Sequence, residues 1–535
     1  MNTSLKKMSK GLRFTAPAAL VLSLAIPTII AYADDGGPTV QTLNSAVQSV
    51  NLDLNTLWVF VAVFLIFFMQ AGFALVETGF TRYKNAAHTM MMNMMVFCVG
   101  AIGYWATGFA LQFGGINYTY PALSASLPAW SFSPVTLSSW ATDVLAKPLL
   151  IAGQNVMGMS GFFLGGLTLS SGILVFFLFQ MVFMDTAATI PTGSMAERLK
   201  FSGFVLMGLW VSMVIYPLVG NWVWGGGWLA NLGRSMGWGN GAVDFAGSGV
   251  VHMIGGTVAL AGAIVIGPRI GKFNKDGSAN SIAGHNIPMG ILGTIILFFG
   301  WFGFNPGSSL GFTGAARNLA VLAAVNTLLA GAAGGMSAMF YMWWFGASRK
   351  PDPSMSVNGL LAGLVAITAP CAFIDVWASV VIGLIAGVWV CIASSLLEKA
   401  KIDDPVGAVP VHMANGLFGV LAVGIFANGN PDTAAWNGVA TPVTGLLYGN
   451  FGQFMAQAAE VVSVLVVVGG LSYVFFKVLA AFKLLRVSAE VELGGLDMPE
   501  MGALAYPQDW EPSEDVTQAL PHYKGNISTA PAATD

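Results

Sequence analysis

The chain has 535 residues, of which 55% are hydrophobic and 9% are charged, with a formal net charge of −3. Soluble domains carry about 25% charged residues, so the composition excludes an ordinary soluble protein, and the nearly balanced charge gives no support to nucleic-acid binding. Apolar runs of about 18 residues or more recur along most of the chain, as is typical of membrane-spanning helices. The composition predicts an all-α polytopic membrane protein.

The first 33 residues have the features of a secretory signal peptide. Four basic residues lie between positions 6 and 13, an apolar run covers about 16–30, and Ala-Tyr-Ala precedes two aspartates. This order predicts cleavage after Ala33, which leaves 34–55 as an extracytoplasmic segment. An uncleaved first span is the alternative, and both readings place the mature N-terminus outside the cytoplasm.

Eleven apolar segments then define a membrane domain at 56–486. They lie near 56–80, 90–113, 161–184, 201–221, 245–267, 288–308, 317–344, 357–375, 378–398, 408–427 and 456–482. The loops on one side contain eleven Lys and Arg residues, and the loops on the other side contain three. Because positive residues favour the cytoplasmic side, this predicts a multi-pass protein of the cell membrane, with the tail at 487–535 in the cytoplasm.

Two stretches of the chain share one pattern. Residues 244–252 read DFAGSGVVH and residues 404–412 read DPVGAVPVH, with Gly three positions and His eight positions after Asp. They lie in the fifth and tenth segments, which run in opposite directions, as in an inverted repeat of five plus five helices with the eleventh as a long C-terminal addition. Eight residues of helix cover about 12 Å of a membrane core about 30 Å thick. The sequence therefore predicts that His252 and His412 meet near the midplane.

A histidine deep in the membrane is costly and usually marks a transport path. Structural packing, haem or metal ligation and proton relay are the alternatives. No further Cys, His or Glu is predicted at the same depth, so we expect neither a cofactor nor a metal. Asp404 fits a helix N-cap, whereas Asp244 could cap its helix or favour a cation. The histidine pair indicates a narrow pore for a small polar solute.

Several further segments resemble the ammonium transporter family of the prokaryotic type, a family that also includes methylammonium permeases and Rh proteins. They are AGFALVETGFTRYKNAAH (71–88), FQMVFMDTAATIPTGSMAERLKFSG (179–203), WGGGWLA (224–230), DFAGSGVVHMIGGTVALAGAIVIGPR (244–269), GWFGFNPGSSL (300–310), NTLLAGAAGG (326–335) and DDPVGAVPVHMANGLFGVLAVGIFA (403–427). They cover about 50 to 500 in the order of the family. The resemblance implies transport of ammonium or ammonia, with methylammonium as a further candidate, and no enzymatic activity.

The resemblance also implies the residues of a pore. His252 and His412 match the midplane histidine pair of the family, in agreement with the repeat argument. Phe183 and Phe304 match the stacked pair that closes the pore above the histidines. Asp244 matches an acid needed for recruitment or for the architecture around it.

An outer recruitment site is implied in the same way. Phe183, Trp224 and Ser308 match its aromatic and hydroxyl groups, and Phe179 matches a further aromatic residue of the vestibule. Ammonium suits such a site because aromatic faces attract cations and a hydroxyl oxygen accepts an N–H group. Potassium cannot give up a proton as ammonium can, which offers a basis for selectivity. The sequence leaves open whether transport is electrogenic or neutral.

Three features depart from the family pattern. The loop at 231–243 is longer than expected, Asp185 stands where a small residue is expected, and Met501 stands where a histidine is common. Asp185 is two positions after Phe183, about 200° around the helix, so we expect its side chain to point away from the pore.

The family resemblance implies a homotrimer and a cytoplasmic tail that contacts a PII-type regulatory protein, a contact that Met501 puts in question. An ammonium sensor that signals through a partner protein with little flux is the alternative function.

Overall fold

The computed structural model describes residues 39–114, 149–151, 154–165, 171–434 and 436–506. The predicted signal peptide and the end of the tail lie outside these residues. The chain divides into two compact units, Met1–Asp53 and Leu54–Asp535. In the first unit, the described residues form the opening turns of helix α2, and most of them are exposed. The described residues from Leu54 onward belong to the second unit.

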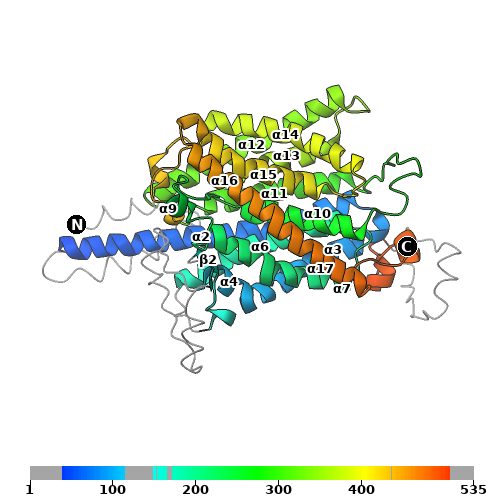
Figure 1. The fold of residues 1–535 in the computed structure, drawn as a ribbon, viewed down its shortest axis with the longest axis horizontal. Helices are drawn as coiled ribbons and strands as arrows, with labels where there is room; N and C mark the ends of the chain where they lie inside the picture. Colours follow the sequence, from blue (N-terminus) through cyan, green and yellow to red (C-terminus); the bar gives the residue numbers. More distant parts are fainter. Residues whose placement is uncertain (1–38, 115–148, 152–153, 166–170, 435, 507–535) are drawn as a thin grey trace, which may run out of the picture. The chain divides into compact units, whose positions relative to one another are not determined.

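The described part of this unit consists mostly of helices (Figure 1). One antiparallel hairpin is formed by β1 (Leu149–Ile151) and β2 (Gln154–Met157). The α-helices are α2 (Val40–Phe80), α3 (Ala86–Gly103), α4 (Phe109–Phe113), α6 (Ser171–Met195), α7 (Phe201–Trp210), α8 (Tyr216–Val223), α9 (Leu232–Met236), α10 (Ile254–Ile266), α11 (Ile287–Gly307), α12 (Ala315–Phe345), α13 (Pro353–Thr368), α14 (Val376–Lys399), α15 (Asn415–Phe426), α16 (Phe451–Ser463), α17 (Gly469–Ala481) and α18 (Ala489–Gly494).

Short π-helical segments continue several of these helices without a break. They are η2 (Tyr104–Gly108) after α3, η4 (Val211–Ile215) between α7 and α8, η5 (Ser248–Met253) before α10, η6 (Val409–Ala414) before α15 and η10 (Val464–Val468) between α16 and α17. In Figure 1, α16 and α17 therefore form one long helix across the face of the molecule. The π-helical turn η11 (Asp497–Met501) lies in the tail.

Ten helical stretches of the described chain are long and apolar enough to cross a membrane, one fewer than predicted. The predicted segment at 357–375 corresponds to α13, which has only 16 residues and a length of about 24 Å. Its last carbonyl groups lie inside the bundle, where Thr368 O and Ala369 O accept hydrogen bonds from the backbone of Ala246 and Phe245. The helix is short because another segment meets its end within the membrane domain.

The third apolar segment is displaced from its predicted position at 161–184. The helix, α6, begins at Ser171 and continues to Met195. The predicted segment ended at residue 184 because Asp185 interrupts the apolar run. In the structure this residue is only 3% exposed, and the helix continues past it. A charged side chain marks the end of a membrane span only where it is exposed to water, and the side chain of Asp185 is buried.

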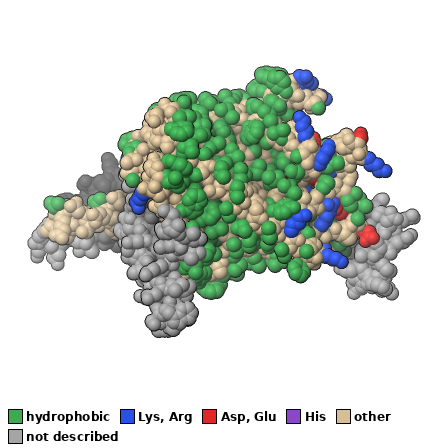
Figure 2. Space-filling view, in the orientation of Figure 1, with side chains coloured by type: hydrophobic (Ala, Val, Ile, Leu, Met, Phe, Trp, Pro, Cys, Tyr) green, Lys and Arg blue, Asp and Glu red, His purple; other side chains and the backbone are tan. Residues whose placement is uncertain are grey.

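Close contacts between backbones build the interior of the bundle. A Cβ atom on Gly387 of α14 would lie 2.1 Å from the carbonyl oxygen of Gly334 on α12, so neither helix has room for a larger side chain there. Small residues allow such approach between membrane helices. Hydrophobic side chains cover the middle of the face in Figure 2, and Lys and Arg gather at the end where α17 finishes.

Candidate functional site

The two repeated motifs build the same local structure. In each, an aspartate precedes a glycine with positive φ, which is 108° at Gly247 and 80° at Gly407. A π-helical segment follows, and it carries His252 in η5 and His412 in η6. The left-handed conformation favours glycine, which explains why glycine occupies the same place in both motifs.

The two aspartates cap these segments to different extents. Asp244 is 1% exposed, and its carboxylate accepts four backbone N–H groups, from Gly247, Ser248, Gly249 and Val250, at 2.7–3.1 Å. Asp404 accepts two, from the residues at 407 and 409, at 3.0 and 2.7 Å. With both oxygens occupied by backbone donors, the Asp244 carboxylate acts as a helix cap. Its backbone oxygen accepts the indole N–H of Trp224 at 2.7 Å.

The two histidines contact each other in the interior. Their Nδ1 atoms lie 3.2 Å apart and share one hydrogen bond, and their ring centroids are 5.2 Å apart. His252 is fully buried, and His412 is 6% exposed. His252 Nε2 has no hydrogen-bond partner among the described residues. One nitrogen of the pair is therefore free to bind a polar solute.

Aromatic rings continue the stack on the His252 side. The ring of Phe304, on α11, lies 5.5 Å from that of His252, and the ring of Phe183, on α6, lies 4.0 Å from that of Phe304 with an angle of 26° between the planes. We call Phe183, Phe304, His252 and His412 the ring column. The four rings come from four different segments, so the column requires the assembled bundle.

A cavity, which we call the Trp224 cavity, lies at the Phe183 end of the column. It is lined by Phe179, Gln180, Phe183, Trp224, Phe245, Ser308, Leu310 and Trp436. All four residues predicted for recruitment are among them. The Ser308 hydroxyl donates to the backbone oxygen of Phe304 at 2.9 Å, which leaves its oxygen free to accept from a ligand. This cavity can offer aromatic faces and one hydroxyl oxygen to a small cation.

A second cavity lies at the His412 end of the column. It is lined by Phe73, Val76, Glu77, Ile190, Leu297, Asn358, Leu361, Val406, Gly407, Ala408, Val411 and His412. Most of these side chains are apolar. The cavity places one carboxyl group, that of Glu77, on the same open space as the imidazole of His412.

The structure adds aromatic residues that sequence reasoning did not select. Trp436 lines the first cavity and donates its indole N–H to Ser308 O at 2.8 Å. Trp301 packs beside the column, with its ring centroid 5.1 Å from that of His252 and 5.8 Å from that of Phe304. The chain has 16 tryptophans, and membrane proteins carry many at their interfaces. Nothing in the sequence distinguishes these two from the rest.

The residues that depart from the family pattern lie away from both cavities. Asp185 is buried on α6 and lines neither cavity, and its Oδ1 has no partner among the described residues. In the loop at 231–243, the backbone N–H groups of Asn240 and Val243 donate to Gln453 and Gln457 of α16 at 2.9 and 2.8 Å. The long loop is thus held against α16 rather than over the Trp224 cavity.

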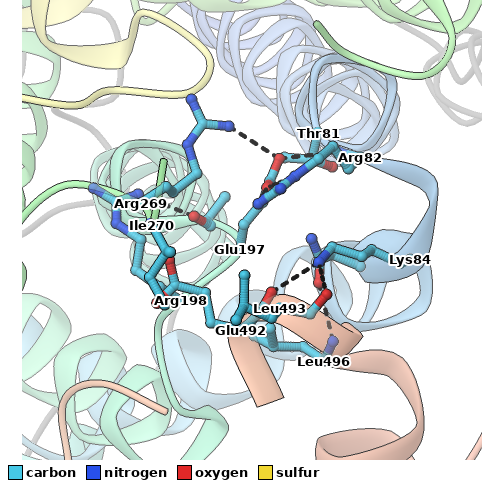
Figure 3. Close-up of polar contacts among 12 residues, drawn as sticks. Thr81, Arg82, Lys84, Glu197, Arg198, Arg269, Ile270, Glu492, Leu493 and Leu496 are labelled. Atoms are coloured by element: carbon cyan, nitrogen blue, oxygen red, sulfur yellow. Dashed lines mark hydrogen bonds and ion pairs between the residues drawn. The ribbon is translucent and has the colours of Figure 1, made fainter. Parts of the chain in front are cut away.

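A charged cluster lies at the other end of α10 (Figure 3). Arg269 forms ion pairs with Asp403 at 2.8 Å and with Glu197 at 3.1 Å, and Glu197 also pairs with Arg82. We call these four residues the Arg269 cluster. Burial alone would raise the pKa of Asp403, but its hydrogen bonds with Arg269 and the charges of Arg198 and Arg269 lower that pKa to about 2. Asp403 is therefore ionised and paired with Arg269 at neutral pH.

The tail closes over this cluster. Glu492 of α18 pairs with Arg486 at 2.8 Å and accepts the backbone N–H of Ile270 at 2.7 Å, while Lys84 donates to the backbone oxygens of Glu492 and Leu493 (Figure 3). Farther along, Asp497 accepts from the first turn of α3, and Glu500 accepts from the first residue of α7. Met501, the residue that departs from the family pattern, ends η11 beside these contacts.

Comparison with known proteins gives a consistent answer. The model of the Ammonium Transporter Family matches residues 57–506. Ammonium transporter Amt2 of Archaeoglobus fulgidus is 42% identical over 493 residues, which cover 92% of this chain and 94% of the relative. A putative ammonium transporter of Synechocystis is 34% identical over 475 residues, or 89% and 94% of the two chains.

Two solved structures are also similar. One, named Sensor Amt Protein, has a TM-score of 0.70 and 35% identity, and the match covers 85% of this chain and 100% of that chain. The other, Mep2 of Saccharomyces cerevisiae, has a TM-score of 0.66 and 25% identity, with 82% and 89% covered.

Proposed function

The chain belongs to the ammonium transporter family, and on this premise we propose that it carries ammonium or ammonia along the ring column. The observation that supports this route is the continuous stack of Phe183, Phe304, His252 and His412 between two cavities. Within the described chain, no Lys or Arg lines either cavity, so no fixed positive charge repels a cation there.

Recruitment takes place in the cavity beside Trp224. Ammonium has four N–H groups, of which one donates to the free side of the Ser308 hydroxyl oxygen while the charge lies against the rings of Phe183 and Trp224. An exposed cation–π contact contributes about 0.5–1 kcal/mol, and a desolvated one about 2 kcal/mol or more. Phe179 packs against Phe183, with ring centroids 4.6 Å apart, and keeps that ring in place.

Selectivity arises at the stacked rings of Phe183 and Phe304, which we call the Phe gate. The rings of Phe183 and Phe304 are in van der Waals contact, so a hydrated cation cannot pass without losing its water. Ammonium transfers one proton to a water molecule of its hydration shell and continues as ammonia, which is uncharged and still hydrogen-bonds to His252 Nε2. Potassium has no proton to leave, and a bare ion pays a large desolvation cost in the apolar interior.

Asp244 supports this site as a structural acid. Its carboxylate holds the first turn of η5, which carries His252, and its backbone oxygen orients Trp224. The same arrangement in reduced form at Asp404 fits the inverted repeat of five plus five helices. We place the Trp224 end outside the cell, the Arg269 end and tail in the cytoplasm, and the chain in a homotrimer whose tail contacts a PII-type protein.

An ammonium sensor is the second candidate. The observation that favours it is the similarity to a protein named as an Amt sensor, which covers 85% of this chain. In that case the same column would bind ammonium with little flux, and a partner protein would read the state of the tail.

The test is charge movement in liposomes that contain the full chain, after an ammonium pulse and after a potassium pulse. A transporter gives a saturable ammonium current or, where only ammonia crosses, a rise in luminal pH, and it gives neither response with potassium; the double variant His252→Ala with His412→Ala loses that selectivity. His285→Ala is the matched control, because that histidine lies outside the column and binds Thr81 and Tyr506. If ammonium binds but neither current nor luminal pH changes, the sensor reading replaces transport.

A further inference from the structure

Glu77 is a buried acid of the membrane domain that the proposed route does not use. It lies on α2, is 3% exposed and lines the second cavity together with His412. Among the ion pairs of the described residues, none includes Glu77. A buried carboxylate without a cationic partner is strongly disfavoured. Glu197, equally buried, has two arginine partners; Glu77 needs another way to avoid an isolated charge.

The hydrogen bonds around Glu77 indicate how this is achieved. The hydroxyl oxygen of Thr192 lies 2.8 and 2.9 Å from the two carboxyl oxygens of Glu77 and 2.6 Å from the backbone oxygen of Thr189. A hydroxyl carries one hydrogen, so it cannot satisfy acceptors on both sides. If Thr192 donates to Thr189 O, the shortest of these contacts, a protonated Glu77 supplies the hydrogen between Glu77 and Thr192. Asn93 donates to Glu77 Oε2 at 2.8 Å and fixes the carboxyl group further.

Among the described residues that line the second cavity, beyond His412, Glu77 is the one acid. The titratable residues that line this cavity are Glu77 and His412. Asp404 lies three residues before Gly407 of the cavity, but its oxygens accept the N–H groups that begin η6. Asn358 donates to the backbone of Val406. An ammonia molecule that passes His412 therefore enters a mostly apolar space with one acidic group at its wall.

We propose that Glu77 is held as a neutral carboxylic acid and protonates ammonia that has passed His412. In this step the Glu77 O–H bond breaks, the lone pair of ammonia forms a fourth N–H bond, and an ammonium–carboxylate pair remains. Ammonium then leaves toward the Arg269 end, and the carboxylate regains a proton from water that reaches the cavity. The inference rests on the proposed function and names a residue for its last step.

The experiment is uptake of radiolabelled methylammonium by liposomes that contain the full chain, corrected with protein-free liposomes. Glu77→Gln keeps the size and hydrogen-bonding capacity of a neutral acid but cannot release a proton. We expect its initial rate to fall about a hundredfold, within the range for a positioned acid or base. Glu77→Asp keeps the acid and recovers part of the rate, a rescue that a merely structural role for the carboxyl group would not produce.

Glu460→Gln is the matched control. Glu460 is another fully buried acid of a membrane helix, and it lies against Gly249, where a Cβ atom would be 2.1 Å from its Oε1. It lines neither cavity, so we expect the same substitution to leave the uptake rate unchanged. An equal loss in both variants would overturn the inference, since it would attribute the effect to any buried acid.

A measurement on the unaltered protein covers the case in which Glu77→Gln does not fold. Infrared difference spectra with and without ammonium should show a carboxylic-acid carbonyl band that decreases on ammonium addition, and this band should shift in Glu77→Asp. Absence of the band overturns the inference, as does equal uptake by wild type and Glu77→Gln. No uptake by the wild type above protein-free liposomes would instead overturn the proposed function, and the inference with it.

Discussion

The ring column and three members of the Arg269 cluster, namely Arg269, Asp403 and Glu197, are buried, but the two regions differ in charge. The column contains four aromatic rings and no Asp, Glu, Lys or Arg side chain, and His252 Nε2 has no hydrogen-bond partner among the described residues. The cluster contains two acids and two arginines, and each lies within 4 Å of a side chain of the opposite charge type. Burial makes an unpaired charge costly. A fixed charge is therefore tolerated where it is paired, and the ring column, which is the proposed path of a small solute, contains no fixed charge.

The two regions also differ in the contacts that hold their side chains together. Both carboxylate oxygens of Asp403 in the cluster accept from Arg269, and Glu492 of the tail accepts the backbone N–H of Ile270, the residue after Arg269. The column is held by stacking and by one hydrogen bond between histidines. The cluster is thus held by charge-assisted hydrogen bonds, and the column is not. Arg269 and Glu197 of the cluster follow the C-terminal ends of α10 and α6, whereas Phe183 lies within α6 and His252 lies in η5, directly before α10.

The largest effect should follow from breaking the cluster. Arg269→Ala leaves Asp403 and Glu197 buried with fewer partners, and removing one member of a buried ion pair costs about 3–5 kcal/mol. Unfolding by dodecyl sulfate in mixed micelles measures this loss. Lys272→Ala is the control, because Lys272 pairs with Glu398, which is 51% exposed, and such pairs contribute about 0–1 kcal/mol. Equal losses would contradict the fixed pairing of the cluster.

The next effect separates the two caps. Asp244→Ala removes four charge-assisted hydrogen bonds from backbone N–H groups and Asp404→Ala removes two. We expect a loss of about 3 kcal/mol for the first and about half of that for the second, measured in the same micelles. A larger loss in Asp404→Ala would contradict the structural role assigned to Asp244.

The pH dependence of stability should come from the cluster. The folded-state pKa of Asp403 is about 2, below the value of about 3.9 for free aspartate. Its charged form therefore stabilises the folded state above pH about 3.9, and this contribution of about 2.5 kcal/mol is lost as the pH falls toward 2. Unfolding midpoints between pH 6 and pH 2, compared for wild type and Asp403→Asn, measure it. If the variant loses stability as steeply as the wild type, another acid is responsible.

The sequence predicted the meeting of His252 and His412, since equal spacing from two helix starts on opposite faces leads both to the same depth. The structure confirms that they lie in contact. The partnership of Phe183 with Phe304 was accessible only through the family resemblance, because 36 phenylalanines give no means of choosing. The roles of these residues remain predictions.

Other features could not be predicted because they depend on what surrounds a residue. Arg198 and Arg269 were counted as loop charges that set orientation, yet both are buried. A hydropathy scale assigns every arginine the same value, whether its side chain is buried or exposed to water. The end of α13 was predicted too late, at 375 instead of Thr368, for a related reason, since this end lies against Phe245 and Ala246 inside the bundle, and an apolar run continues through the turn that follows.

The smallest predicted effect lies at the mouth of the column. Ser308→Ala removes the one hydroxyl oxygen that the Trp224 cavity offers to ammonium, while the aromatic faces remain. A lost hydrogen bond to a charged donor costs about 1.5 kcal/mol at the lower end of its range, which corresponds to roughly a tenfold rise in the half-saturating ammonium concentration. Ser309→Ala is the control, because this hydroxyl bonds to Pro306 and Gly311 and does not line the cavity. Equal shifts in the two variants would attribute the effect to the fold of this turn. A shift confined to Ser308→Ala would show that the cation meets a polar group before it reaches the rings.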